Sequence, residues 1–143
     1  MNRCLTVVGL VAIAFVLGCE PQRTLVPRIE PLTKDVPVPL DFRFEPAQST
    51  EFSNQTTTER HSSYYYTGWA YFEDVVDFYK RRMPVEGWRL QQDVDTGGRK
   101  TLFFKKTGPG TGLEPRTEAP TCIVTIFAND QYATAVRIIR TEK

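Results

Sequence analysis

The sequence predicts an α+β fold, a mainly antiparallel sheet of about five to six strands with one amphipathic helix packed on one face. Three observations predict it. Several short segments have the residue pattern of strands, one segment carries an apolar stripe at helical spacing, and turn-forming residues separate these segments. The predicted order is β-β-α-β-β-β-β, and 143 residues suffice for one domain with a modest core.

Two strands are predicted before the helix. Residues 40–44 (LDFRF) alternate apolar and polar side chains, which is typical of a half-buried strand. Residues 60–69 (RHSSYYYTGW) are rich in aromatic residues, which favour strands. The polar segment 46–59 between them predicts a loop or an irregular edge.

The predicted helix spans residues 72–83 (FEDVVDFYKRRM). Its apolar stripe comprises Phe72, Val75, Val76, Tyr79 and Met83. Acidic residues occupy the first turn and basic residues the last, which complements the helix dipole. Pro84 is expected to end the helix, and Gly87 lies in the turn that follows.

Four strands are predicted after the helix, as two pairs: 88–93 with 99–106, and 121–128 with 132–140. Turns at 94–98 and 129–131 join the strands within each pair. A glycine- and proline-rich loop at 107–120 separates the two pairs.

The N-terminal residues predict that the protein is exported from the cytoplasm. After the positive start Met1-Asn2-Arg3, residues 5–17 form an apolar run that is shorter than the roughly 20 residues a membrane-spanning helix needs. Gly18 then supplies a small residue, and this order of regions is typical of a secretory signal peptide. The alternative is an N-terminal membrane helix or a buried helix.

Val16-Leu17-Gly18-Cys19 resembles the lipobox of bacterial lipoproteins, in which aliphatic residues and a small residue precede a cysteine. The resemblance implies cleavage between Gly18 and Cys19, so that residues 1–18 are the signal peptide and Cys19 receives a diacylglycerol on its sulfur. Leu17 departs from the more usual Ala or Ser. Glu20, where inner-membrane lipoproteins often carry Asp, favours an outer membrane, facing the periplasm, if the cell is Gram-negative.

Residues 19–39 are predicted to form a tether between the lipid on Cys19 and a single domain at 40–143. The tether contains five of the ten prolines, which fix φ and lack the N–H that a helix or central strand requires. We therefore expect this segment to be extended and largely solvated. Two or more acyl chains would hold the domain stably at a membrane.

Three motifs carry a second resemblance: Val36-Pro37-Val38-Pro39, Tyr64-Tyr65-Tyr66-Thr67-Gly68 and Phe78-Tyr79-x-x-x-Met83-Pro84-x-x-Gly87-Trp88. They are similar to those of a group of uncharacterised bacterial lipoprotein domains, over about residues 36–140. The third motif is a helix end that turns into a strand, with Trp88 closing the core. The resemblance implies a fold and no activity.

No pattern of polar residues predicts catalysis. His61 is the only histidine and begins a strand, so an exposed surface position is expected for it. The acidic residues Glu73, Asp74 and Asp77 fit a solvated helix N-terminus better than a pair of catalytic carboxylates. We therefore predict that the protein is not an enzyme.

No metal or cofactor is predicted either. Residues 93–98 begin like a calcium loop but lack its later ligands, and residues 108–112 lack the lysine of a phosphate-binding loop. Cys4 leaves with the signal peptide and Cys19 carries lipid, so Cys122 is expected to be a buried, inert thiol. The interleaved charges and the net charge of +1 do not predict a nucleic-acid partner.

The candidate contact surface comprises Tyr64, Tyr65, Tyr66, Trp69 and Tyr71. Alternate residues of a strand point to opposite faces, so part of this row is expected to face away from the core. Tyr and Trp are favoured at protein contacts. The alternative is that these aromatic residues fill a small core and stiffen the sheet.

We therefore expect a lipid-anchored, non-catalytic protein of the cell envelope, attached to the membrane through Cys19, that binds or scaffolds another envelope protein. The alternative is a small-ligand binding protein, or less favourably an enzyme, with a pocket between the helix and the sheet.

Overall fold

The computed structural model describes residues 24–53, 59–107, 119–129 and 132–142. The predicted signal peptide, the cleavage site at Gly18 and Cys19, and the glycine-rich segment 108–112 lie outside the described residues. Within the described part of the chain, no helix has both the length and the apolar character needed to cross a membrane.

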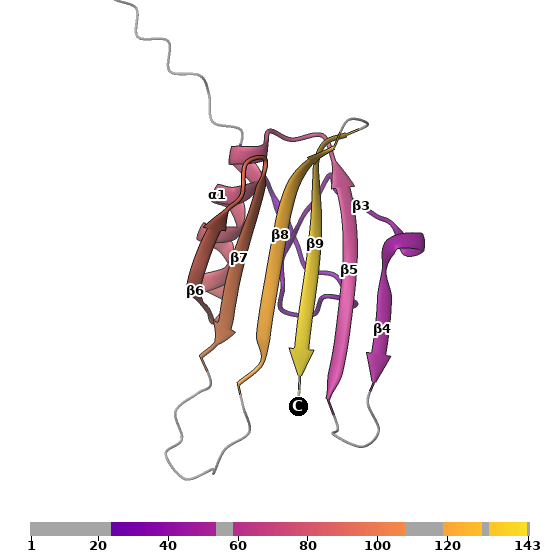
Figure 1. The fold of residues 1–143 in the computed structure, drawn as a ribbon, viewed down its shortest axis with the longest axis vertical. Helices are drawn as coiled ribbons and strands as arrows, with labels where there is room; N and C mark the ends of the chain where they lie inside the picture. The colour runs from indigo at the N-terminus through magenta and orange to yellow at the C-terminus, as the bar shows by residue number, and fades with distance from the viewer. Residues whose placement is uncertain (1–23, 54–58, 108–118, 130–131, 143) are drawn as a thin grey trace, which may run out of the picture.

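A seven-stranded antiparallel sheet forms the centre of the domain (Figure 1). Its strands are β3 (Arg43–Phe44), β4 (Thr50–Ser53), β5 (Arg60–Gly68), β6 (Trp88–Asp95), β7 (Arg99–Lys106), β8 (Thr121–Asn129) and β9 (Tyr132–Glu142). Their spatial order is β3-β5-β9-β8-β7-β6, with β4 also paired to β5. A second sheet pairs β1 (Pro27–Arg28) with β2 (Val38–Pro39).

The predicted α+β class and the mainly antiparallel sheet are confirmed. The predicted strand count and the order β-β-α-β-β-β-β are wrong, because the described residues form nine strands, five of them before the helix. The three additional strands are short, because β1 and β2 have two residues each and β4 has four. β3 is the part of the predicted strand 40–44 that pairs with β5. An alternating pattern cannot be recognised in strands as short as β1, β2 and β4.

The helix α1 (Phe72–Arg82) confirms the predicted helix and ends one residue early, where the 3₁₀ turn η2 (Met83–Glu86) begins. Gly87 ends this turn in the left-handed region, with φ of 82°, which a glycine adopts without strain. Trp88 then starts β6 and is buried. The third motif is therefore the helix-to-strand turn that was expected of it.

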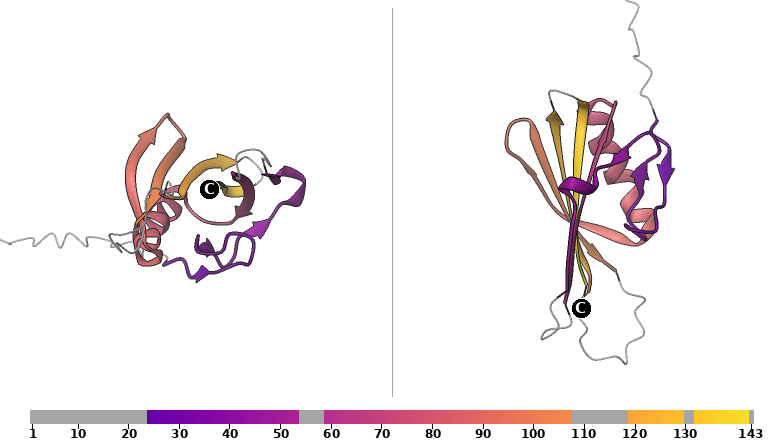
Figure 2. Two further views of the ribbon diagram at one scale, coloured as in Figure 1. Left: turned by 90° about the horizontal axis from the view of Figure 1, so that it is seen from below. Right: turned by 90° about the vertical axis from the view of Figure 1, so that its right-hand side faces the viewer.

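The N-terminal segment differs from the predicted tether, because residues 24–39 pack onto the same face of the sheet as α1 (Figure 2). Val36 and Val38 are fully buried in the core. Pro27 lies opposite Pro39 in the two-stranded sheet, where edge positions tolerate a residue without an N–H. The tether prediction is therefore wrong for residues 24–39, while residues 19–23 lie outside the described part of the chain.

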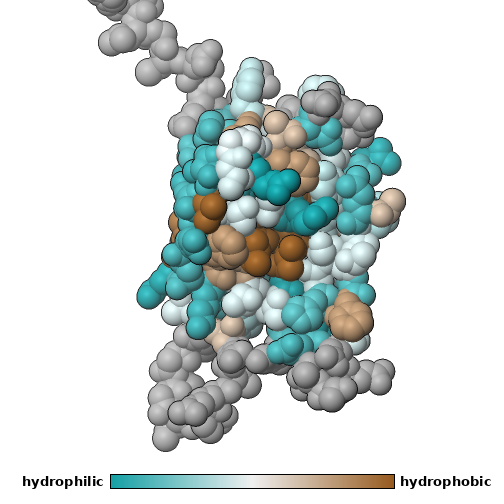
Figure 3. All heavy atoms as spheres, viewed as in Figure 1, coloured by the Kyte–Doolittle hydropathy of each residue, from teal (hydrophilic) through white to brown (hydrophobic). Residues whose placement is uncertain are grey.

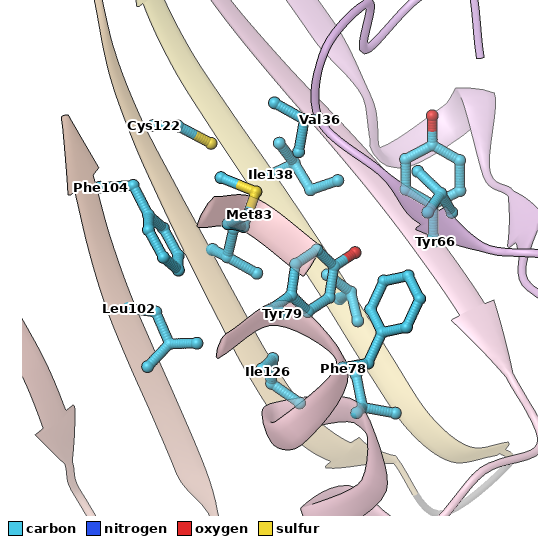
Figure 4. Close-up of a cluster of buried hydrophobic side chains, with 14 of the residues drawn as sticks. Val36, Tyr66, Phe78, Tyr79, Met83, Leu102, Phe104, Cys122, Ile126 and Ile138 are labelled. Atoms are coloured by element: carbon cyan, nitrogen blue, oxygen red, sulfur yellow. The ribbon is translucent and has the colours of Figure 1, made fainter. Parts of the chain in front are cut away.

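The core lies between the sheet and the layer formed by α1 and the N-terminal segment. Figure 4 shows its side chains from all three parts, with Met83 of η2 beside Ile138 of β9. Gly68 at the end of β5 lets the ring of Phe42 approach, because a Cβ at this position would be 2.3 Å from the ring. None of the described helical residues lies on the other face of the sheet.

Candidate functional site

The predicted contact surface divides into a buried and an exposed part. Tyr64, Tyr65 and Tyr66 are buried, whereas Trp69 and Tyr71, between β5 and α1, are 77% and 72% exposed. The three tyrosines therefore do not form an exposed contact surface: Tyr64 and Tyr66 fill the core, as in the alternative, and Tyr65 is buried among side chains on the opposite face. The physical reason is that Tyr64 and Tyr66 point into the core, while side chains of neighbouring strands pack against Tyr65 on the opposite face, which the sequence pattern did not reveal.

On the core face of β5, two tyrosine hydroxyls donate hydrogen bonds to carboxylates. The Tyr66 hydroxyl lies 2.8 Å from Glu30 Oε2, and the Tyr64 hydroxyl donates to Glu51. Burial, followed by the bond to Glu30, raises the pKa of Tyr66 well above its usual range. Burial is also the first cause of the raised pKa of Tyr64, with Glu51 adding to it. Both phenols therefore stay neutral, and their role is structural.

On the opposite face, side chains of neighbouring strands cover Tyr65. Its ring centre lies 5.6 Å from that of Phe127, and the Arg137 guanidinium carbon lies 5.6 Å from the Tyr65 ring centre. Burial raises the pKa of Tyr65, against the opposing effect of Arg137. These contacts form one end of a larger surface on this face.

That surface, here called the uncovered face, is the side of the sheet away from α1 and the N-terminal segment. Strand pairing places Phe103, Ile123 and Ile139 in one row across β7, β8 and β9. Their chain neighbours Leu102, Val124 and Ile138 are buried on the core side, so this row points the other way. The row is half-buried, and Figure 3 shows hydrophobic side chains at the middle of this face.

Basic side chains border the apolar row. Arg99 and Lys105 of β7 and Arg137 of β9 are exposed, and the register places all three on the uncovered face. We call them the basic rim. No acidic residue is found among the described residues of β7, β8 and β9 that point to this face, from Arg99 to Thr141. A carboxylate does lie near its far edge, where Glu45 accepts a hydrogen bond from Thr67 of β5 at 3.0 Å.

A group of charged side chains surrounds Trp88 on the core side of the sheet. We call it the Trp88 cluster, and it comprises Asp35, Trp88, Lys106, Arg140 and Glu142. Arg140 Nη1 lies 2.8 Å from Asp35 Oδ1, Lys106 Nζ contacts Asp35 Oδ2, and Arg140 Nη2 contacts Glu142. Lys106 Nζ lies 5.0 Å and the Arg140 guanidinium carbon 5.8 Å from the Trp88 ring centre. Both cations are thus matched by carboxylates and by an aromatic face.

The Trp88 cluster is a structural feature rather than a reactive one. The Trp88 indole donates to the Asp35 carbonyl oxygen at 3.1 Å, which fixes the N-terminal segment to β6. Burial, followed by the neighbouring Arg140, lowers the pKa of Lys106. The cluster joins segments from both ends of the chain and presents no free nucleophile or base.

A groove of about 470 Å³ lies beside this cluster, between the N-terminal segment, β4 and β5. Lys34 and Arg140 line it, and both pair with Glu142. Glu142 therefore offsets the charges of these two cations, and Glu51, Arg60 and His61 also line the groove. The interface between α1 and the sheet, where the alternative hypothesis expected a ligand pocket, is filled by side chains that are at most 2% exposed: Tyr66, Phe78, Tyr79, Met83, Leu102, Ile126 and Ile138.

The residues weighed for catalysis and metal binding are spread over the domain. His61 is exposed, with Nδ1 3.2 Å from the Thr141 hydroxyl and Nε2 3.6 Å from Glu59. Asp93 pairs with Lys80 at 2.7 Å and with Lys100 at 3.1 Å. The hydrogen bond from Lys80 is the main cause of its lowered pKa. Among the described residues, no group of three His, Cys, Asp or Glu side chains could hold a metal ion.

Cys122 is buried in β8, as its apolar surroundings predicted, and Figure 4 shows its sulfur within the core. Burial raises the pKa of its thiol to about 12. The reactive thiolate is therefore scarce near neutral pH. The structure gives this residue a packing role.

Comparisons of this chain with protein-family models, with curated proteins and with solved structures found no match.

Proposed function

We propose that this chain is a non-catalytic envelope protein, held at a membrane by lipid on Cys19, that binds a protein partner through the uncovered face. The lipid anchor is supported by the resemblance of Val16-Leu17-Gly18-Cys19 to a lipobox. The binding function is supported by one observation, the apolar row bordered by the basic rim on a sheet face that no described element covers.

An antiparallel sheet with one solvated face usually carries polar side chains on that face. Here β8 and β9 carry apolar residues on both faces at the middle of the sheet, with Ile123 next to Val124 and Ile138 next to Ile139. A contiguous apolar patch with a polar border is typical of a protein interaction site. Such sites combine an apolar centre with a solvated charged border.

The basic rim specifies the chemistry of the partner. A partner with aliphatic or aromatic side chains flanked by carboxylates would match the row and the rim together. Two copies of this chain meeting face to face would bring their basic rims together, which disfavours self-association through this surface. We therefore expect a different protein with an acidic contact surface, in the same envelope compartment.

The Cys19→Ala variant is expected to lose its membrane attachment, because the lipid is the only anchor that the proposal invokes. Cell fractionation and flotation measure this, with the mass of the N-terminal peptide reporting acylation. Cys122→Ala is the matched control, since that thiol is buried in the core. Equal membrane attachment of the wild-type and Cys19→Ala proteins would contradict the anchor.

A photo-crosslinking phenylalanine analogue at position 103 is expected to capture a defined partner in intact envelopes, because Phe103 lies in the apolar row. Adding Arg137→Glu should lower the yield of this adduct roughly tenfold or more, since like charges at an interface repel. Immunoblotting of the adduct measures the yield.

Two matched controls lie away from the uncovered face. Val85 in η2 is an exposed apolar position for the same analogue, and Arg81→Glu reverses an exposed charge on α1. The binding proposal fails if position 85 gives the same adduct, or if Arg81→Glu lowers the yield as much as Arg137→Glu does.

A further inference from the structure

The loop between β5 and α1 displays two large aromatic side chains on a rigid support. Trp69 is 77% and Tyr71 72% exposed, whereas Ala70 between them packs against the core. The Ala70 carbonyl oxygen accepts a hydrogen bond of 2.7 Å from the buried Thr134 hydroxyl. The Tyr71 carbonyl oxygen accepts the Val75 N–H at 3.2 Å, in the first turn of α1. Both rings are therefore held outward by fixed backbone.

This loop lies toward the end of the domain where the described chain begins. Figures 1 and 2 show the connection from β5 to α1 and the first described residues near the upper end of the sheet, and the C-terminus at the lower end. Thr24 follows Cys19 by five residues, which span at most roughly 18 Å when fully extended. The nine residues of β5 alone span roughly 30 Å. A lipid on Cys19 would therefore hold the upper end, and not the lower, near the bilayer.

The exposed side chains near this entry have the chemistry of a membrane interface. Trp and Tyr are favoured at the level of the lipid headgroups, because each ring has an apolar body and a polar group. Val26, two residues after Thr24, is 58% exposed, and its carbonyl oxygen accepts the N–H of Leu40, which is 49% exposed. The exposed carboxylate of Glu73 in the first turn of α1 disfavours anionic lipid.

We propose that Trp69 and Tyr71 rest in the headgroup region of a zwitterionic bilayer and orient the anchored domain. The inference rests on the proposed lipid at Cys19. In this orientation the strands extend away from the membrane. The uncovered face is then directed along the bilayer plane rather than toward the bilayer. A partner in the same membrane, or one lying against it, can then reach the basic rim.

The fluorescence of the lipidated full chain in phosphatidylcholine vesicles tests this orientation, because the chain has two tryptophans. Trp88 is 1% exposed and provides a constant background, so bromine on the acyl chains should quench Trp69 selectively. We expect at least half of the Trp69 emission to be lost. The Trp69→Phe variant, which retains Trp88, should show no quenching.

The outcomes separate this inference from the proposed anchor. Acylated protein that floats with the vesicles and keeps its full Trp69 emission overturns the orientation and leaves the anchor standing. Protein whose N-terminal peptide carries no lipid overturns both. Quenching that disappears in Cys19→Ala supports both, and quenching that persists in Cys19→Ala supports the contact of Trp69 with the bilayer without the anchor.

Discussion

Replacing Trp88 by alanine is expected to lower the free energy of unfolding by about 3–5 kcal/mol, the range found when a large buried aromatic residue is truncated. The ring is 1% exposed, lies beneath two cations and donates a hydrogen bond to Asp35. Truncation would leave a cavity and remove the aromatic face from Lys106 and Arg140. Urea unfolding followed by far-UV circular dichroism measures the loss.

Trp69→Ala is the matched control, because it makes the same substitution at a ring that is 77% exposed. Surface substitutions of this kind usually change stability by less than about 0.5 kcal/mol. Circular dichroism is preferred to fluorescence because each variant removes one of the two tryptophans. Similar losses in the two variants would contradict the structural role assigned to Trp88.

Asp35→Ala is expected to destabilise the domain by about 2–4 kcal/mol, because it leaves two partly buried cations without their shared carboxylate. Asp35 pairs with Lys106 and Arg140, whose side chains are 25% and 10% exposed. This partial exposure keeps the expected loss below that of a fully buried pair. Chemical denaturation of the variant and the wild type gives the difference.

Two comparisons isolate the charge effect at Asp35. Asp95→Ala removes a carboxylate that is 58% exposed and lies 3.4 Å from Lys100, so a loss of about 1 kcal/mol or less is expected. Combining Asp35→Ala with Lys106→Met should cost less than the sum of the single changes, since the double variant also removes the Lys106 charge that Asp35→Ala leaves without its carboxylate. Additive losses would show that the two side chains are not coupled.

The second half of the fold could be predicted because its elements are long and regular. The helix 72–83 and the hairpin of 88–93 with 99–106 follow from the spacing of apolar residues and from the turns between them. Observed boundaries differ by up to two residues, as where β6 continues to Asp95 and β9 to Glu142. Such differences are expected where strand ends gain pairing from the neighbouring strand.

The N-terminal layer could not be predicted because proline residues are compatible with two different structures. Five prolines between residues 19 and 39 favoured a solvated tether, although proline is also compatible with the edge of a small sheet. Val36 and Val38 flank Pro37 with the alternation of a buried strand, and both are fully buried. That alternation was the local signal for packing, but the tertiary contacts of the folded chain are needed to recognise it as a buried strand.

The contact surface predicted from the sequence differs from the uncovered face. The exposure of Trp69 and Tyr71 agrees with the predicted contact surface, and the burial of the three tyrosines does not. The apolar row was missed, although the neighbouring apolar pairs Phe103-Phe104 and Ile138-Ile139 signal strands that are apolar on both faces. Register across three strands is needed to see that these residues form one patch.

The position of β9 in the sheet determines when this protein can fold. β9 is the last described strand along the chain, yet it lies between β5 and β8 and pairs with both. Until residues 132–142 are available, β5 cannot be joined to the sheet of β6, β7 and β8. The edges of β5 and β8 that β9 pairs with then stay open. A chain threaded N-terminus first through an export channel would therefore pass unfolded and complete its sheet only after its last strand had emerged.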